Sequence, residues 1–294
     1  MPTLRVLVTG SSGLLGEDVA KVLKLKGHEV IEVKSRKDLD LTDSGRTIEF
    51  IERLKPDAVI HCAGTHDVDE CEKDPVSVLL NTVLTTRNIS LACRKVGCVI
   101  LYPGSDYIFD GMKNQPYLEL DLPNPVNSYG RAKLAAEREI MSLTSSYFIV
   151  RVPVLFGAGG YKERNIIYNT YMKLKRGELI KAAHDQVSSC GYTRDIAEAF
   201  ERILRTDYYG IYHVANEGFC SRYEMYREIA IQLGFPEDMV IAVHSSEIER
   251  LARRPLYTVV NTSLAEKVFG LKLRHWKRAL EECVREFKER HGIR

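Results

Sequence analysis

The 294-residue sequence lacks a strong excess of charge: 42 lysine and arginine residues nearly balance 40 aspartate and glutamate residues, which leaves a formal net charge of +2. Such a balance gives no general attraction for nucleic acid or for an anionic membrane surface. The sequence also lacks an apolar run approaching the ~18 residues that a membrane-spanning helix needs. We therefore expect neither nucleic acid nor a membrane as a partner.

Cysteine is present without a paired motif. The seven cysteines are scattered, none forms a Cys-x-x-Cys pair, and several lie within apolar stretches, as reduced core thiols do. No two cysteine or histidine residues have the spacing of zinc ligands, so the sequence predicts no metal site. An apolar strand pattern begins by Leu4, without a signal-peptide layout before it. These absences predict a reducing, cytoplasmic location.

What the sequence contains is 45% hydrophobic and 28% charged residues, the composition of an ordinary globular protein. In its first half, short apolar runs alternate with stretches in which apolar residues recur at helical spacing. They predict strands at residues 4–9, 29–33, 57–61, 98–102 and 147–155, and helices at 14–26, 47–54, 76–96 and 125–143. This alternation predicts an α/β protein with a Rossmann-type, doubly wound parallel sheet and helices on both faces.

Beyond residue 156 the alternation loosens and helices dominate the pattern. We expect helices at 165–176, 193–204, 221–233, 245–251, 263–269 and 276–290, with one strand at 210–215. The sequence therefore predicts a dinucleotide-binding domain at 1–155, to which the segment 186–214 returns, and a smaller, mostly helical substrate-binding lobe at 156–185 and 215–294. Because no linker of low complexity separates them, both parts are expected to form one continuous body.

A glycine-rich turn follows the first expected strand and opens the first expected helix. It reads G-x-x-G-x-x-G at Gly10, Gly13 and Gly16. Glycine permits a tight turn and lets backbone N–H groups and the helix N-terminus approach a pyrophosphate. A tight turn without a ligand is the alternative, but the strand–turn–helix context favours dinucleotide binding.

The choice of dinucleotide depends on the end of the second expected strand. An acidic residue there would hold the ribose of NAD. This sequence instead has Ser35 and Arg36 between two lysines, which suits the 2′-phosphate of NADPH. NADPH is therefore the expected cofactor. NADH stays open, because Glu32 would point to the ribose if the strand ends two residues earlier than we expect.

A tyrosine and a lysine at i and i+4, Tyr129 and Lys133, fall on one face of an expected helix. A nearby ammonium stabilises phenolate, lowers the tyrosine pKa and makes the phenol a usable general acid. A second pair with this spacing, Tyr171 and Lys175, is expected to be helix surface. Ser105 separates the two pairs, because it follows the fourth expected strand, at the sheet edge where ligands bind.

The glycine loop, Ser105, Tyr129 and Lys133 together resemble the extended short-chain dehydrogenases/reductases. Four segments are more narrowly similar to dTDP-4-dehydrorhamnose reductases: G-S-D-Y-I-F-D-G (104–111), N-P-V-N-S-Y-G-R-A-K (124–133), H-D-Q (184–186) and R-R-P (253–255). The resemblance implies NAD(P)H-dependent reduction of the C4 keto group of a nucleotide-linked 4-keto-6-deoxy sugar. A homodimer is compatible with this interpretation.

The resemblance also implies roles for particular residues. Lys133 would hold the nicotinamide ribose, Tyr129 would protonate the developing alkoxide, and Ser105 would donate a hydrogen bond to it. The expected cofactor-binding residues are Gly10, Ser12, Gly13, Leu14, Leu15, Gly16, Ser35, Arg36, Asp40, Leu41, Cys62, Ala63, Gly64, Tyr129, Lys133 and Pro153. The expected substrate-binding residues are Ser105, Asp106, Tyr107, His66, Val154 and Arg254.

The sequence departs from the family pattern at three positions. Val154 stands where the family carries a tryptophan near the sugar, and His66 replaces the usual threonine. Arg194 occupies a place where some members bind magnesium through an acidic side chain, so no such metal is expected. Among the arginines before Pro255 that could clamp a diphosphate, which include Arg250, the family match favours Arg253 or Arg254.

Two other functions in this superfamily stay open. The segment R-V-P-V-L-F-G (151–157) is also similar to the regulatory β subunit of methionine adenosyltransferase, a non-catalytic dinucleotide-binding partner of a synthetase. A nucleotide-sugar epimerase would need a further acid or base such as His66. A dehydratase is not expected, because Tyr107 follows Asp106 where a dehydratase has glutamate.

Overall fold

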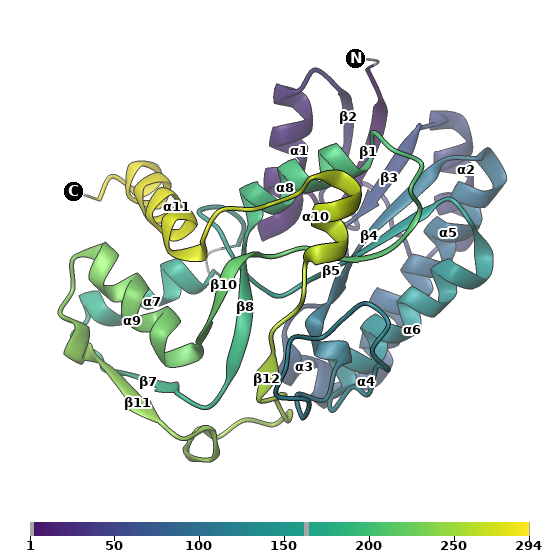
Figure 1. The fold of residues 1–294 in the computed structure, drawn as a ribbon. Helices are drawn as coiled ribbons and strands as arrows, with labels where there is room; N and C mark the ends of the chain where they lie inside the picture. The colour runs from purple at the N-terminus through teal and green to yellow at the C-terminus, as the bar shows by residue number, and fades with distance from the viewer. Residues whose placement is uncertain (1–2, 162–164, 294) are drawn as a thin grey trace.

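The computed structural model describes residues 3–161 and 165–293. Within them, a six-stranded parallel sheet has the order β2-β1-β3-β4-β5-β9 (Figure 1). Its strands are β1 (Arg5–Thr9), β2 (Glu29–Val33), β3 (Ala58–His61), β4 (Val99–Ser105), β5 (Tyr147–Val152) and β9 (Gly210–His213). The strand order reverses between β1 and β3, which makes the carboxyl edge there the expected ligand site of a doubly wound sheet. The predicted α/β fold class is confirmed.

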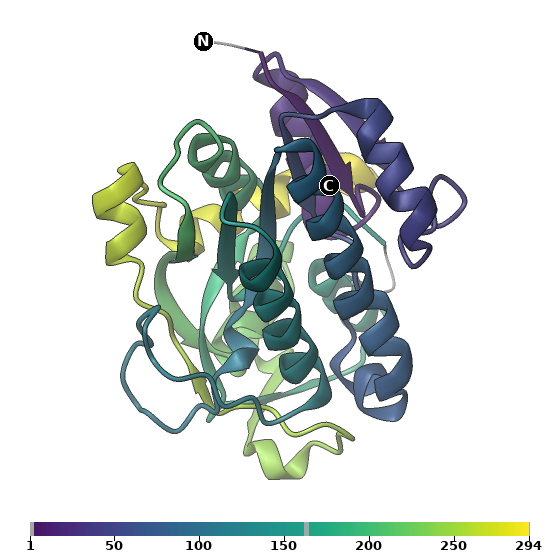
Figure 2. The same cartoon turned by 90° about the vertical axis from the view of Figure 1, so that its right-hand side faces the viewer.

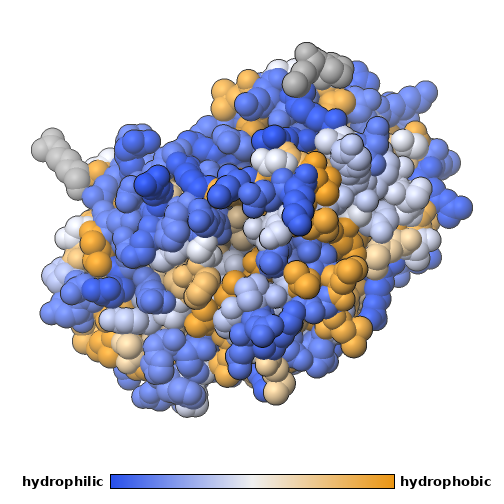
Figure 3. Space-filling model, viewed as in Figure 1, coloured by the Kyte–Doolittle hydropathy of each residue, from blue (hydrophilic) through white to orange (hydrophobic). Residues whose placement is uncertain are grey.

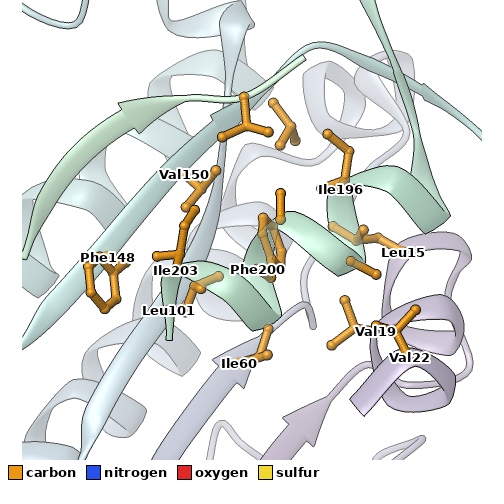
Figure 4. Close-up of a cluster of buried hydrophobic side chains, with 14 of the residues drawn as sticks. Leu15, Val19, Val22, Ile60, Leu101, Phe148, Val150, Ile196, Phe200 and Ile203 are labelled. Atoms are coloured by element: carbon orange, nitrogen blue, oxygen red, sulfur yellow. The ribbon is translucent and has the colours of Figure 1, made fainter. Parts of the chain in front are cut away.

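Helices cover both faces of this sheet, as Figures 1 and 2 show. They are α1 (Leu14–Leu25), α8 (Thr193–Ile203) and α10 (Ser263–Phe269) on one face, and α2 (Ser44–Leu54), α5 (Thr85–Val96) and α6 (Ser128–Leu143) on the other. Successive residues of strand β5 pack on opposite faces of the sheet. Phe148 and Val150 pack with α1, α8 and α10 (Figure 4), whereas Ile149 between them packs with α2, α5 and α6.

A second part of the molecule contains two small sheets. In one, β8 (Val187–Tyr192) pairs with β6 (Val154–Phe156), β10 (Asn216–Ser221) and β12 (Tyr257–Thr258). In the other, β7 (Ile180–Ala183) pairs with β11 (Val240–Val243). Helices α7 (Ile166–Lys175), α9 (Arg222–Leu233) and α11 (Trp276–His291) complete this part. A core that includes Phe156, Tyr192, Trp276 and Phe287 holds it together.

The structure corrects several expected elements. The lobe at 156–185 and 215–294, which was expected to be mostly helical, also holds the strands β7, β10, β11 and β12, which are too short to show a clear alternation. The expected helix at 245–251 is wrong: only a 3-10 turn forms at Ser245–Glu247. The long helix expected at 76–96 is preceded by α3 (Val68–Lys73) and divides into α4 (Pro75–Val78), a π-helical turn (Leu79–Leu84) and α5. Ser105 was expected in the loop after this strand, but it is the last residue of β4, because the strand continues three residues beyond its expected end at residue 102.

The proposed division into domains stays a prediction. Within the segment 186–214, β9 pairs with β5 and α8 packs against α1, which supports its return to the part that holds the six-stranded sheet. Strand β8, at the start of the segment, instead belongs to a small sheet of the second part. Hydrophilic residues cover most of the face drawn in Figure 3. None of the described helices combines the length and apolar character needed to cross a bilayer.

Candidate active site

A cavity of about 700 Å³ opens at the carboxyl ends of the parallel strands. All the expected cofactor-binding residues line it: Gly10, Ser12, Gly13, Leu14, Leu15, Gly16, Ser35, Arg36, Asp40, Leu41, Cys62, Ala63, Gly64, Tyr129, Lys133 and Pro153. The expected substrate-binding residues Ser105, Asp106, Tyr107, His66 and Val154 line the same cavity. The structure thus brings together segments that lie far apart in the sequence.

The glycine loop forms the wall of this cavity next to α1. Gly10 has a φ of +66°, and a Cβ there would lie 2.7 Å from the backbone nitrogen of Ala63. Gly13 caps α1 without a side-chain hydrogen bond to the helix. The first-turn N–H groups of α1 therefore have no capping side chain, and they line a cavity that can take an anionic group. This geometry fits the pyrophosphate of a dinucleotide.

The end of β2 carries a hydroxyl and a guanidinium toward the cavity. Ser35 and Arg36 line it, and Arg36 is hydrogen-bonded to the side chain of Asn81, a further lining residue. Glu32 instead binds Lys24 and does not line the cavity. The strand ends at Val33, as expected, so the alternative in which Glu32 points to a ribose is wrong for this structure.

Helix α6 positions the tyrosine and the lysine. Its N-cap, Asn127, accepts a hydrogen bond from Gly130 N at 2.8 Å. A Cβ on Gly130 would lie 2.2 Å from the carbonyl oxygen of Tyr107, so glycine permits close approach of α6 to the turn after Ser105. This approach brings Tyr129 next to Ser105.

The pKa of Tyr129, next to Ser105 and Lys133, differs from the expectation. Burial raises the pKa of Tyr129, although an interaction with Ser105 acts in the opposite direction. Lys133 Nζ donates to Pro103 O at 2.7 Å and lies 4.4 Å from the centroid of the Tyr102 ring. Burial lowers the pKa of Lys133 to about 8. The predicted lowering of the Tyr129 pKa by Lys133 is therefore wrong for the protein without ligand, and Tyr129 holds its proton at neutral pH.

Asp106 connects Ser105 to the smaller part of the protein. Its Oδ1 accepts from Ser105 Oγ at 3.3 Å, and its Oδ2 accepts from Thr258 Oγ1 of β12 at 2.6 Å. Burial raises the pKa of Asp106 to about 6, while the hydrogen bond from Thr258 and the charge of Arg222 act to lower it. Asp106 thus supports the position of Ser105 from inside the cavity wall.

The structure places two arginines at positions that the sequence analysis did not predict. Arg254 is not among the described residues that line the cavity, and its guanidinium binds the carboxylate of Asp69 at 2.8 Å; its predicted contact with the substrate stays a prediction. Arg222, which the sequence analysis missed, does line the cavity beside Tyr107. Burial acts to lower the pKa of Arg222, but interactions with Tyr107 and Tyr226 raise it above its usual value. The sequence analysis expected a helix to begin at Ser221. That pattern does not show in which direction the Arg222 side chain points.

Arg194 also has partners inside the protein. It forms ion pairs with Glu282 at 3.2 Å and with Glu286 at 2.6 Å, both on α11. This side chain therefore ties α8 to the C-terminal helix. Among the residues that the structure describes, no three histidine, cysteine, aspartate or glutamate side chains gather in a way that could hold a metal ion.

The doubly wound sheet, with its glycine loop and the Ser105–Tyr129–Lys133 cluster in one cavity, defines the class of the short-chain dehydrogenases/reductases, which are dinucleotide-dependent oxidoreductases. The chain belongs to the RmlD substrate binding domain family, which matches residues 4–289.

Individual relatives span nearly the whole chain. The spore coat polysaccharide biosynthesis protein SpsK of Bacillus subtilis is 31% identical over 282 residues, which cover 96% of this chain and 97% of that protein. A crystal structure of dTDP-4-dehydrorhamnose reductase from Bacillus anthracis in complex with NADP is 30% identical, with a TM-score of 0.91, and covers 97% of this chain and 100% of that one. Methionine adenosyltransferase 2 subunit beta of Xenopus tropicalis is 29% identical, over 91% of this chain and 83% of that protein.

Proposed function

We propose that this protein is an NADPH-dependent reductase that converts the C4 keto group of a nucleotide-linked 4-keto-6-deoxy sugar into a hydroxyl. The observation that carries the proposal is the convergence of Ser105, Tyr129 and Lys133 in the cavity that the glycine loop also lines. The similarity to a dTDP-4-dehydrorhamnose reductase in complex with NADP supports both the substrate class and the cofactor.

NADPH bound in this cavity would supply the hydride for the sugar C4 carbon. The open N–H groups at the start of α1 suit its pyrophosphate, and Ser35 and Arg36 suit its 2′-phosphate. Glu32, the carboxylate that would favour NADH, is bound to Lys24. These contacts support NADPH over NADH.

The residues of the chain supply the proton and orient the substrate. Tyr129 keeps its proton at neutral pH, because burial raises its pKa, and it donates that proton to the C4 oxygen as the carbonyl is reduced. The Ser105 hydroxyl, supported by Asp106, donates a hydrogen bond to the same oxygen. Lys133, one helical turn from Tyr129, supplies a positive charge that favours the phenolate left behind.

Consumption of NADPH tests this function directly. The purified protein is mixed with NADPH and a dTDP-4-keto-6-deoxy sugar, and the loss of NADPH absorbance is followed together with the sugar product. We expect one 4-hydroxy sugar formed for each NADPH oxidised. A changed sugar configuration without oxidation of NADPH would instead indicate an epimerase that uses His66, which also lines the cavity.

A non-catalytic binding subunit is the second candidate. The 29% identity with methionine adenosyltransferase 2 subunit beta favours it. In that case the protein binds NADPH and co-purifies with a synthetase, but it oxidises no NADPH with any nucleotide-linked 4-keto sugar. The same assay therefore separates the two candidates.

A further inference from the structure

A buried ion pair lies behind the active-site cavity. The side chains of Glu137 on α6 and Arg151 on β5 are 0% and 4% exposed. Arg151 Nη2 donates to Glu137 Oε2 at 2.9 Å, and Arg151 Nε donates to Glu137 Oε1 at 3.1 Å. Because both oxygens accept from the guanidinium, the geometry is that of an ionised carboxylate. Neither residue is among the described residues that line the cavity, so the pair acts on the cavity only through a neighbour.

The carboxyl end of β4 leaves room for this pair. Gly104 of β4 lies opposite Arg151 in the parallel register. A Cβ at Gly104 would lie 2.7 Å from Glu137 Oε1 and 2.9 Å from Arg151 Cγ, so glycine permits both charged groups to pack against the strand. Arg151 Nη1 also donates to Glu119 O at 3.1 Å. The guanidinium is thus fixed from two sides and holds the carboxylate in one place.

Lys133 is the neighbour that connects the pair with the cavity. Lys133 and Glu137 stand at i and i+4 on α6, so their side chains are adjacent on one face of the helix. The negative charge of Glu137 acts to raise the pKa of Lys133, against the burial that lowers it to about 8. Lys133 lines the cavity, and its Nζ is bound to Pro103 O.

The other titratable groups around this ammonium carry no charge at neutral pH: Cys62, Cys71, His61, Tyr102 and Tyr129. Burial raises the pKa of the two thiols, to about 12 and about 11, and it raises the pKa of both phenols. Burial lowers the pKa of the imidazole to about 3. Among the residues that the structure describes, Glu137 is therefore the one anion whose charge acts on this ammonium.

Stability alone does not account for the pair. Removing two charges from water costs free energy that offsets much of their attraction, and apolar side chains of similar size often replace such a pair without loss of stability. Apolar side chains would not supply a negative charge beside Lys133. The chemistry of the pair therefore points to an effect on this lysine.

We propose that Glu137, held in place by Arg151, is a positioning residue that keeps the Lys133 side chain in its cationic form in the active-site cavity. This inference rests on the proposed function, because the cation favours the phenolate that Tyr129 leaves when it donates its proton. Glu137 acts through Lys133 and has no contact of its own with the cavity. The ion pair thus extends the pH range of the reduction upward.

The titration of Lys133 tests this inference without turnover. Protein isotopically labelled at lysine Cε is followed by NMR from about pH 6 to about pH 10, and the Lys133 signal is assigned by its loss in Lys133→Arg. Glu137→Gln removes the charge at the same side-chain size. Glu139→Gln is the matched control, because Glu139 lies on the same helix and forms an exposed ion pair with Arg87 at 2.7 Å. We expect the Lys133 midpoint to fall by about one pH unit, a tenfold change, in Glu137→Gln and to stay unchanged in the control.

The pH dependence of turnover connects this titration with the reaction. Lys133 loses its charge as pH rises through its pKa, so kcat/KM for the 4-keto sugar should fall on the alkaline side. In Glu137→Gln this fall should begin about one pH unit lower, and Glu137→Asp, which keeps the charge, should restore part of the difference. A uniform loss of kcat/KM at every pH, with the alkaline fall at the wild-type position, is the result of a merely structural role and overturns the inference.

The inference and the proposed function can fail separately. An unchanged Lys133 midpoint in Glu137→Gln overturns the inference even where the wild type reduces the sugar. A lowered midpoint in a protein that oxidises no NADPH with the 4-keto sugar overturns the reductase function and leaves the effect of Glu137 on Lys133 standing.

A double variant controls for folding. If Glu137→Gln does not fold because Arg151 is left without its carboxylate, Glu137→Met combined with Arg151→Met removes both charges at similar size. The Lys133 midpoint should fall in this double variant as well. A midpoint equal to that of wild type contradicts the inference.

Discussion

Thr258 donates a hydrogen bond to Asp106 at 2.6 Å, and Asp106 directly follows Ser105, the serine that we propose contacts the substrate. Strand β12 of the smaller part therefore contacts the end of β4 in the parallel sheet. The Asp106 carboxyl is buried, and this burial raises its pKa to about 6. The protonation state of Asp106 therefore affects the contact between β12 and the end of β4, where the two parts of the molecule meet.

The first prediction concerns the pH dependence of stability. In the folded protein Asp106 has a pKa of about 6, whereas an unfolded aspartate has a pKa of about 4. The folded state therefore binds more protons between these values, and this group makes the free energy of unfolding fall as pH rises from about 4 to about 6. Asp106→Asn removes this contribution.

Denaturant unfolding at several pH values checks this prediction. The free energy of unfolding of Asp106→Asn, relative to that of wild type, should increase as pH rises from about 4 to about 6. A constant difference across this range would show that Asp106 does not titrate with a raised pKa. Asp121→Asn provides a control, because Asp121 lies near the surface and a hydrogen bond with Lys113 lowers its pKa.

The second prediction concerns the glycine loop. Gly10→Ala places a Cβ 2.7 Å from Ala63 N at a φ of +66°, whereas Gly27→Ala has a similar φ of +82° and meets no atom within 4 Å. Both variants should lose about 1 kcal/mol of unfolding free energy to the left-handed backbone. Gly10→Ala should lose more, and it should also lose NADPH affinity.

Thermal unfolding and NADPH titration of both variants separate the two effects. The loss of NADPH affinity should be confined to Gly10→Ala, because Gly27 follows α1 at the end remote from the loop. Equal NADPH affinity in the two variants would contradict the role of the loop in cofactor binding.

The third prediction concerns cofactor choice. Arg36→Ala removes the guanidinium at the end of β2 and should weaken NADPH binding about tenfold while NADH binding changes little. Lys37→Ala removes a neighbouring charge that does not line the cavity and serves as the control. Fluorescence titration with both cofactors measures the ratio. Parallel losses for NADPH and NADH would place the recognition of the 2′-phosphate elsewhere.

Sequence reasoning succeeded where local patterns determine position. Tyr129 and Lys133 follow an N-capping Asn127 on one helix, and Ser105 ends a strand of the parallel sheet. Because the carboxyl ends of parallel strands meet at one edge, these positions could be inferred without coordinates. The glycine loop was inferred in the same way, from its place between a strand and a helix.

Sequence reasoning failed where long-range packing determines the position or the pKa of a side chain. Arg254 was expected at the substrate, and that contact stays a prediction, but its ion pair with Asp69, far away in the sequence, was not anticipated. Arg222 was missed because its position depends on short strands of the smaller part that show little periodicity. The pKa of Tyr129 was misjudged for a related reason, since spacing reveals a neighbouring lysine but not the extent of burial.

The fourth prediction concerns the proton donor. Tyr129→Phe removes only the phenolic hydroxyl, and Tyr171→Phe makes the same change in the other Tyr-x-x-x-Lys pair. The Tyr171 ring packs against Phe235 and Phe287 and does not line the cavity. Loss of the general acid typically costs a factor of about 100 or more in turnover.

Paired measurement of kcat and of Kd for NADPH in these two variants tests the central claim most directly. We predict that Tyr129→Phe lowers kcat for the 4-keto sugar about 100-fold or more with NADPH affinity near that of wild type, while Tyr171→Phe keeps both. Turnover by Tyr129→Phe at the rate of Tyr171→Phe would contradict the account.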